Sequence, residues 1–451
     1  MRKLLFLLFS LIILTTALPL NAFAAYTSAF EVDSNIAYLI SLDDESTVIY
    51  DKNSTQKTSP AALVKIVTGI IVIENCANLD EVVTASADSI RRLDGTGSTI
   101  AGILVGEQLS VRQLLYCMLV YNANDAVNVL VDLIGGNSEN FVAMMNEFAQ
   151  KLQCTDTHFT NPNGFDSTEQ YTTARDMAVI LKYCMKNNTF SEIISTPLYE
   201  IAPTNEYTET RYLRNTNSLL NSAISDYYFQ YVKGGKSAVT SEDRCNVVSV
   251  AFKDGYNYLC VCLDSPVMDF DDDGVDENMA FVDSKKLYEW TFSNIRLRTV
   301  ANKTTYVGEI EVRLSSQYDY VSVVPAEDIN ALVPSGVNAE SVYIEIMPEL
   351  TQTVVDAPIK KGDKLGRAAI KYAGETIAEV DLCAAFDVKR SAGKYAVDIL
   401  LKIVNTIVFK CVAAVIVIVI VPAAVITFIK NRARRKKDKI RLVKKPDEKS
   451  K

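Results

Sequence analysis

The chain has 451 residues, of which 49% are hydrophobic and 22% charged, and it carries a formal net charge of −9 at pH 7. This length leaves room for two packed domains. The nine cysteines show no short repeated spacing, which argues against a zinc cage or a disulfide framework. We expect no cofactor, because no motif indicates one.

The N-terminal residues 1–24 have the pattern of a secretory signal peptide. Arg2 and Lys3 precede an apolar run from Leu4 to Leu18, and Ala22-Phe23-Ala24 provides a small-x-small cleavage site. An uncleaved anchor is the alternative, and the cleavage site favours removal. We therefore expect the mature chain to begin outside the cytoplasm.

The first folded region, residues 25–296, mixes strand and helix patterns. Two apolar runs between Tyr38 and Tyr50 indicate a β-hairpin, and the segment from Val247 to Leu263 is typical of paired strands. Apolar residues at helical spacing predict helices over Ile66–Glu74, Gln113–Leu133 (broken by a turn), Phe141–Leu152, Ala174–Lys186 and Ser284–Ile295. This order predicts an α+β domain with an antiparallel sheet flanked by helices.

The second region, residues 297–390, changes to short alternating runs with turn residues between them. These runs are Thr305–Arg313, Tyr318–Pro325, Val342–Met347, Lys364–Tyr372 and Glu375–Leu382. The pattern predicts a small all-β domain. We favour a stalk that lifts the first domain from a membrane over a site for a protein partner.

Near the C-terminus, residues 411–429 contain no charged side chain and are rich in Val and Ile. As a helix they would be about 28 Å long, close to the thickness of the hydrocarbon core of a bilayer. We therefore predict one transmembrane helix. Residues 391–410 before it form a juxtamembrane segment whose amphipathic pattern suits the membrane surface.

The tail, residues 430–451, holds twelve Lys/Arg and three Asp/Glu, a net charge of +9, so the rest of this −9 chain sums to −18. Basic residues directly beside a membrane helix mark its cytoplasmic side. The sequence thus predicts a single-pass cell-membrane protein with an extracellular ectodomain and a cytoplasmic C-terminus. We expect no nucleic-acid partner, because the tail adjoins the span.

Three short motifs suggest an active site. The segment Pro60–Lys65 reads PAALVK, and it is similar to an S-x-x-K motif with Ala62 in the place of the serine. The segment Tyr121–Ala126 reads YNANDA, where an S-x-N motif would have its serine at Asn122. The segment Val232–Thr240 reads VKGGKSAVT, and its Lys-Ser-Ala triplet is similar to K-T-G.

These motifs, with the runs Thr157–Gly164 and Tyr171–Ala178, resemble the serine-type D-alanyl-D-alanine carboxypeptidases, the low-molecular-mass penicillin-binding proteins. The resemblance covers roughly Ala25 to Ile295. It implies a penicillin-binding, β-lactamase-like transpeptidase fold. It also implies peptidoglycan stem peptides ending in D-Ala-D-Ala as the ligand. Residues Asp356–Leu382 are similar to the C-terminal β domain of the same enzymes.

The resemblance implies a role for each motif residue. Position 62 would carry the nucleophile and Lys65 its base, with Asn122 and Asn124 as the second wall. Lys236 and Ser237 would hold the substrate carboxylate. Three departures follow: Ala62 removes the nucleophile, Asn122 removes a hydroxyl from the proton route, and Ala238 adds a methyl group where the family has glycine.

Two hypotheses compete for the function. The first is a pseudo-enzyme that binds stem peptides without hydrolysing them. The second is an active carboxypeptidase with another nucleophile; Ser59 is the nearest candidate, but it belongs to the loop before the helix. A Ser-His-Asp triad is improbable because His158 is the only histidine. Docking of a protein partner, such as a cell-wall enzyme, stays open as a third possibility.

The segment Asp269–Gly274 matches the first half of a calcium-loop pattern, D-x-D-x-D-G. The twelfth position, where such loops have a bidentate Glu, is Ala280. Asp276, Glu277 or Asp283 are possible substitutes. We favour a solvated acidic loop and predict no metal.

Overall fold

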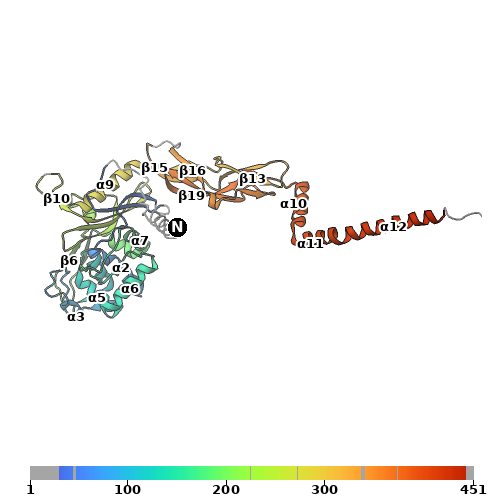
Figure 1. The fold of residues 1–451 in the computed structure, drawn as a ribbon. Coiled ribbons are helices and arrows are strands. Elements are labelled where there is room, and N and C mark those ends of the chain that lie inside the picture. Colours follow the sequence, from blue (N-terminus) through green and yellow to red (C-terminus); the bar gives the residue numbers. More distant parts are fainter. Residues whose placement is uncertain are drawn as a thin grey trace, which may run out of the picture. The chain divides into compact units, whose positions relative to one another are not determined.

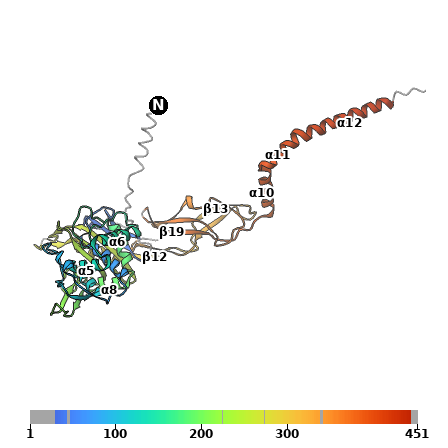
Figure 2. The same cartoon turned by 90° about the horizontal axis from the view of Figure 1, so that it is seen from below.

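The structure is a computed structural model that describes residues 30–43, 47–223, 225–271, 273–336, 341–372 and 374–442. The predicted signal peptide lies outside these residues. The chain forms two compact units (Figures 1 and 2). The first comprises the chain up to Val300 with two later segments, Asn330–Tyr343 and Ile370–Ala378.

The first unit is built on a five-stranded antiparallel sheet in the order β2-β1-β9-β8-β7. Its strands are β1 (Ile36–Ser41), β2 (Val48–Lys52), β7 (Val232–Val239), β8 (Cys245–Lys253) and β9 (Tyr256–Ser265). Strand β7 is the last in the order, so among the described residues one of its edges has no partner strand. Its pairing with β8 shifts register between Val232 and Gly234, as at a β-bulge.

Helices cover both faces of this sheet. Most of them pack on one face: α2 (Val64–Asn75), α3 (Ala87–Arg91), α4 (Val111–Leu119), α5 (Asn124–Gly135), α6 (Ser138–Lys151), α7 (Ala174–Cys184) and α8 (Asn188–Ile194). Helix α9 (Met279–Asn294) packs on the other. Both faces of the sheet are apolar, as strand β9 illustrates. Its alternate residues face opposite sides, so Leu259 and Val261 join the first apolar core while Cys260 and Cys262 join the second.

Short elements complete this unit. Two 3-10 helices, η1 (Ala61–Leu63) and η2 (Ser218–Leu220), lie near the sheet edge formed by β7. Three small antiparallel ladders pair β3 (Val82–Thr84) with β4 (Gln108–Ser110), β5 (Leu198–Ile201) with β6 (Arg211–Arg214), and β10 (Val267–Met268) with β11 (Glu277–Asn278). The predicted α+β domain is confirmed.

The region after α9 is built from strands, as predicted. A six-stranded sheet has the order β16-β18-β19-β14-β13-β17, and β12 pairs with β15. The strands are β12 (Ile295–Ala301), β13 (Gly308–Arg313), β14 (Tyr320–Pro325), β15 (Ile329–Pro334), β16 (Val342–Ile346), β17 (Val354–Asp356), β18 (Lys364–Tyr372) and β19 (Glu375–Ala384).

The chain ends in helices α10 (Ala392–Asn405), α11 (Ile407–Val415) and α12 (Val421–Leu442), with a π-helical turn, η5 (Ile416–Ile420), between the last two. Within the described residues, Ile407–Arg435 is the one helical stretch long and apolar enough to cross a membrane. The mean hydropathy of its most apolar 18-residue window is 3.1, and none of that window is buried in the protein. A C-terminal membrane anchor fits this helix.

Candidate active site

The three motifs meet where helix α2 begins beside strand β7. The first motif forms η1 and the first turn of α2, and the second forms the turn between α4 and α5. The third lies in β7, at the open edge of the sheet, and η1 packs against β7 and β8. The tertiary fold therefore brings together residues far apart in the sequence.

Lys65 lies in the first turn of α2 and is 1% exposed. Its Nζ donates hydrogen bonds to the backbone oxygen of Asn122 (3.0 Å) and to Oδ1 of the same residue (2.8 Å). Burial lowers the pKa of the Lys65 amine well below its usual value; nearby Lys236 lowers it further, while Asp125 opposes the shift. Both donor contacts of this amine are therefore with one residue, Asn122.

Asn122 has a left-handed backbone, with φ of 72°. Asparagine tolerates this conformation better than most residues, which suits it to the turn. Asn124 follows as the first residue of α5 and is buried. Its Oδ1 has no hydrogen-bond partner in the described part of the chain, so one acceptor at the site is unused.

Lys236 is fully buried in β7, at 0% exposure. Its Nζ donates to Oγ1 of Thr216 (3.2 Å) and to the backbone oxygen of Ser237 (3.3 Å), and no described carboxylate forms an ion pair with it. Burial lowers the pKa of this amine to about 7. The site thus contains a buried amine that is charged below about pH 7 and has no anionic partner among the described residues.

Thr216 organises this side of the site. Its Oγ1 accepts the hydrogen bond from Lys236, and its backbone oxygen accepts one from Oγ of Ser237 (2.8 Å). Thr216 is a residue that the sequence analysis missed. The polar run Asn215–Asn217 just before η2 was the available signal, because such a run between buried segments needs partners.

The two alanines at motif positions both lie in buried surroundings. Ala62 and Ala238 are 8% and 4% exposed and belong to the apolar core beneath the helices. Ala61, next to the nucleophile position, has φ of 44°. Gly164 packs so closely on this turn that an added Cβ would lie 2.5 Å from the Ala61 oxygen. A side chain at position 164 would therefore displace the turn.

Ser59 is held away from Lys65. Its Oγ donates to Oδ1 of Asp166 (2.9 Å), and its backbone oxygen accepts from Nδ2 of Asn246 (3.0 Å). The Lys65 amine donates to Asn122 and the Ser59 hydroxyl to Asp166, so these two groups do not share a hydrogen bond. Ser59 therefore has no lysine positioned as its base, as the serine of an S-x-x-K motif would have.

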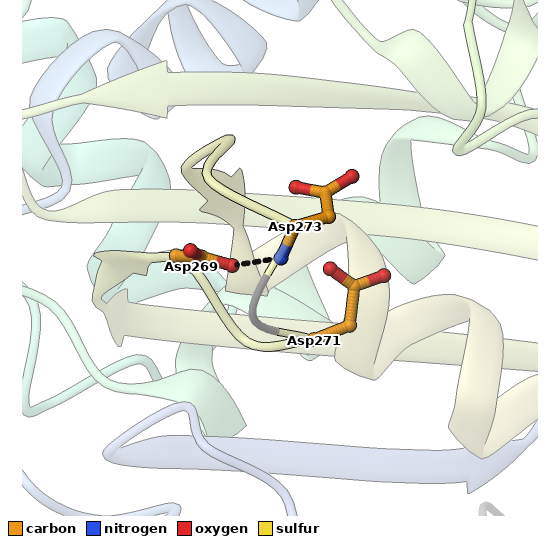
Figure 3. Close-up of side chains that lie close together, drawn as sticks. All are labelled: Asp269, Asp271 and Asp273. Carbon is orange, nitrogen blue, oxygen red and sulfur yellow. Dashed lines mark hydrogen bonds between the residues drawn. The ribbon is translucent and has the colours of Figure 1, made fainter.

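The acidic loop is a separate cluster (Figure 3). Oxygens of Asp269, Asp271 and Asp273 lie within 4.8 Å of one another and could hold a cation. Asp269 already accepts hydrogen bonds from the backbone N–H groups of Asp273 (3.1 Å) and Gly274 (2.9 Å). The carboxylates thus close a turn by themselves, and the predicted absence of a metal stays a prediction.

Comparison with known proteins gives a consistent picture. Residues 23–267 match the D-alanyl-D-alanine carboxypeptidase family, and residues 296–390 match the C-terminal domain of penicillin-binding protein 5. The chain is 27% identical to D-alanyl-D-alanine carboxypeptidase DacF of Bacillus subtilis over 398 residues, which covers 87% of this chain and 96% of the relative.

Solved structures agree on the fold. Penicillin-binding protein 5 from Haemophilus influenzae has a TM-score of 0.59 at 24% identity, covering 81% of this chain and 100% of its own. The D-alanyl-D-alanine carboxypeptidase DacD from Francisella tularensis has a TM-score of 0.63 at 22% identity, covering 81% and 95%. The fold that the motifs implied is confirmed.

Proposed function

Because the chain belongs to the D-alanyl-D-alanine carboxypeptidase family, we propose that it is a pseudo-enzyme of peptidoglycan metabolism. It binds stem peptides ending in D-Ala-D-Ala and does not hydrolyse them. The nucleophile position is Ala62, and a methyl group cannot form an acyl-enzyme. The protein then acts as a binder or scaffold in cell-wall synthesis.

One observation carries this proposal. Lys236 is a fully buried amine whose partners are a hydroxyl and a backbone carbonyl, with no described carboxylate. A buried charge is costly unless it is paired, so an anionic ligand group is the partner that this lysine lacks. The terminal carboxylate of a peptide supplies such a charge.

The open edge of β7 suits the rest of the ligand. An extended peptide adds to a free sheet edge by backbone hydrogen bonds, while its side chains contact what lies on either side. Asn124 contributes a buried acceptor without a partner, which an amide N–H of the ligand can satisfy. In this arrangement Lys236 and Ser237 hold the carboxylate, and Asn124 faces the peptide backbone.

The reacting side supports binding without turnover. Lys65 donates to both oxygens of Asn122, so the amine that would serve as base is occupied by an amide that cannot take part in proton transfer. The missing serine and the hydrogen bonds from Lys65 to Asn122 both act against catalysis. Ala62, Lys65 and Asn122 together therefore account for the proposed loss of chemistry.

The test is a calorimetric titration of the detergent-solubilised full-length protein with an N-acylated peptide ending in D-Ala-D-Ala. The matched control is the same peptide with a C-terminal amide. We expect weak binding of the acid, none of the amide, and no release of D-alanine. Equal binding of both peptides, or of neither at millimolar concentration, would leave docking of a protein partner as the surviving interpretation.

A second candidate is an active carboxypeptidase that uses Ser59. The observation in its favour is the hydrogen bond from the Ser59 hydroxyl to the Asp166 carboxylate. A carboxylate is a weak base for a serine hydroxyl, so we rank this function second. Release of D-alanine by the wild-type protein, abolished by Ser59→Ala, would establish it.

The location completes the proposal. We infer that the helix Ile407–Arg435 anchors the chain in the cell membrane, with both folded units outside and the basic tail inside. External protease should digest the units in cells whose wall has been removed and should spare the tail. Protection of the folded units would overturn this orientation.

A further inference from the structure

The contact between Lys65 and Asn122 holds an amine against a carboxamide. Nζ of Lys65 lies 2.8 Å from Oδ1 of Asn122 and 3.0 Å from the backbone oxygen of the same residue. A neutral amine has two N–H bonds and one lone pair, so these two contacts use both protons and leave the lone pair for attack. The pair thus consists of a nucleophile and an electrophile at hydrogen-bond distance.

The atoms that would react are close to attack distance. Because a C=O bond is about 1.2 Å long, Cγ of Asn122 lies within about 4 Å of Nζ of Lys65. Reacting atoms in near-attack conformers are about 3–3.5 Å apart. The left-handed backbone of Asn122 keeps both of its oxygens on the same amine. A small shift of the lysine side chain therefore brings its lone pair onto Cγ.

The surroundings favour the nucleophilic form of the amine. Burial of Lys65 lowers the pKa of its amine, which increases the fraction that carries a lone pair. The carboxylate of Asp125, which acts on this amine electrostatically, is buried and fixed by the backbone N–H groups of Ala101 (3.0 Å) and Ile103 (2.9 Å). A fixed anion at this place stabilises the positive charge that develops on an attacking nitrogen.

The amide nitrogen of Asn122 is not held in place. Among the described residues, no hydrogen bond engages its Nδ2, and the residue is partly exposed, so a released ammonia has a route to solvent. In water at neutral pH, ammonia takes up a proton and becomes ammonium, which withdraws it from the reverse reaction. Exchange of one amide for another therefore runs toward the cross-linked product.

We propose that Lys65 and Asn122 form an intramolecular isopeptide bond. Nζ of Lys65 attacks Cγ of Asn122, the new C–N bond forms as the Cγ–Nδ2 bond breaks, and one proton passes from Nζ to Nδ2, which leaves as ammonia. The step is an acyl transfer within the chain and needs no second substrate. It joins α2 to the α4–α5 turn across 57 positions of sequence. The bond consumes the amine on the reacting side and leaves the β7 side unchanged.

Peptide mapping of the full-length protein tests the bond. A protease that cuts after lysine should fail to cut after Lys65, and the peptides containing Lys65 and Asn122 should be joined, with a mass lower by one ammonia than their sum. Lys65→Met and Asn122→Ala should each restore separate peptides. Lys233→Met is the control, because Lys233 is an exposed lysine of β7, and this variant should keep the cross-link.

Thermal unfolding measures what the bond does. As with a disulfide, a cross-link that closes a long loop restricts the unfolded chain, so we expect Lys65→Met and Asn122→Ala to unfold about 5–15 °C below the wild type. Asn122→Asp separates the bond from the hydrogen bonds. It keeps two oxygens for Lys65, but an ionised carboxylate is a poor electrophile, so this variant should also lack the cross-link and unfold below the wild type.

The outcomes separate this inference from the proposed function. Separate peptides of full mass in the wild-type protein would overturn the cross-link. Loss of ammonia from the Asn122 peptide alone would mean cyclisation onto the neighbouring backbone and would overturn it as well. Neither result bears on stem-peptide binding, which the calorimetric titration measures. A cross-linked protein that binds no peptide would support the isopeptide bond and overturn the proposed function.

Discussion

The two sides of the candidate site differ in what they retain. On the side of α2 and the α4–α5 turn, Ala62 lacks a hydroxyl and Lys65 is occupied by Asn122. On the side of β7, Lys236 and Ser237 keep their polar groups, and Thr216 holds both in place. Under the proposed function, this contrast means that ligand recognition and bond cleavage depend on separate groups, so that one can be lost while the other remains.

The largest effect should be seen in acylation by a β-lactam. Removal of a serine nucleophile costs on the order of 10⁶ in rate, so fluorescent penicillin should form no covalent adduct with the wild-type protein. Ala62→Ser should label slowly, and the triple variant Ala62→Ser/Asn122→Ser/Ala238→Gly faster, because Lys65 is then released from Asn122. Gel fluorescence and adduct mapping measure this. A wild-type adduct at Ser59 would contradict the comparison.

The next largest effect is expected on the β7 side of the site, at Lys236. Lys236→Met removes one partner of a desolvated ion pair, which typically costs about 2–5 kcal/mol, or roughly thirtyfold or more in affinity for the D-Ala-D-Ala peptide. Lys233→Met is the control, because Lys233 is an exposed lysine on the same strand. If both variants bind like the wild type, the carboxylate is held elsewhere. The readout is the calorimetric dissociation constant.

A third prediction tests the packing that shapes the reacting side. Gly164→Ala would place a methyl group 2.5 Å from the Ala61 oxygen and 2.6 Å from the Ala62 Cα, at a residue with φ of 87°. Overlap and backbone strain together should lower the free energy of unfolding by about 2–4 kcal/mol. Gly336→Ala, where no described atom beyond the chain neighbours lies within 4 Å of the added Cβ, should leave the thermal midpoint unchanged.

The smallest effect is the pH dependence of peptide binding. Because burial lowers the pKa of Lys236 to about 7, the free protein holds this amine charged below pH 7 and increasingly neutral above it. Affinity for the peptide acid should be flat below pH 7 and fall by up to about tenfold per pH unit above it. The Lys236→Met variant should lose this dependence. A wild-type affinity that rises with pH would contradict the assignment.

Sequence patterns predicted much of this molecule for physical reasons. Alternating and helical spacing of apolar residues predicted the hairpin of β1 and β2, the strands β8 and β9 and the major helices, because burial of one face imposes those periods. The three motifs were identified in order, and the structure brings them together. Their individual roles stay predictions.

Side-chain partners were less predictable. The hydrogen bonds from Lys65 to Asn122 join residues 57 positions apart, and they depend on the left-handed backbone of Asn122. The polar run around Thr216 and the family-like run that ends at Gly164 do not specify which contacts these residues make, and Asp166 carries no pattern at all. Their contribution lies in the position that the tertiary fold gives them. Local periodicity contains no information on such contacts.

The open edge of β7 has a consequence for the solution behaviour of the protein. An unpaired strand edge is a template for another chain, and natural proteins protect such edges with charges and bulges. Here the register shift between Val232 and Gly234 and the exposed Lys233 guard the first half of the strand. From Gly235 to Ala238 the strand is buried, so in this half only Val239 is exposed to another chain and the aggregation risk is confined to the end of the strand.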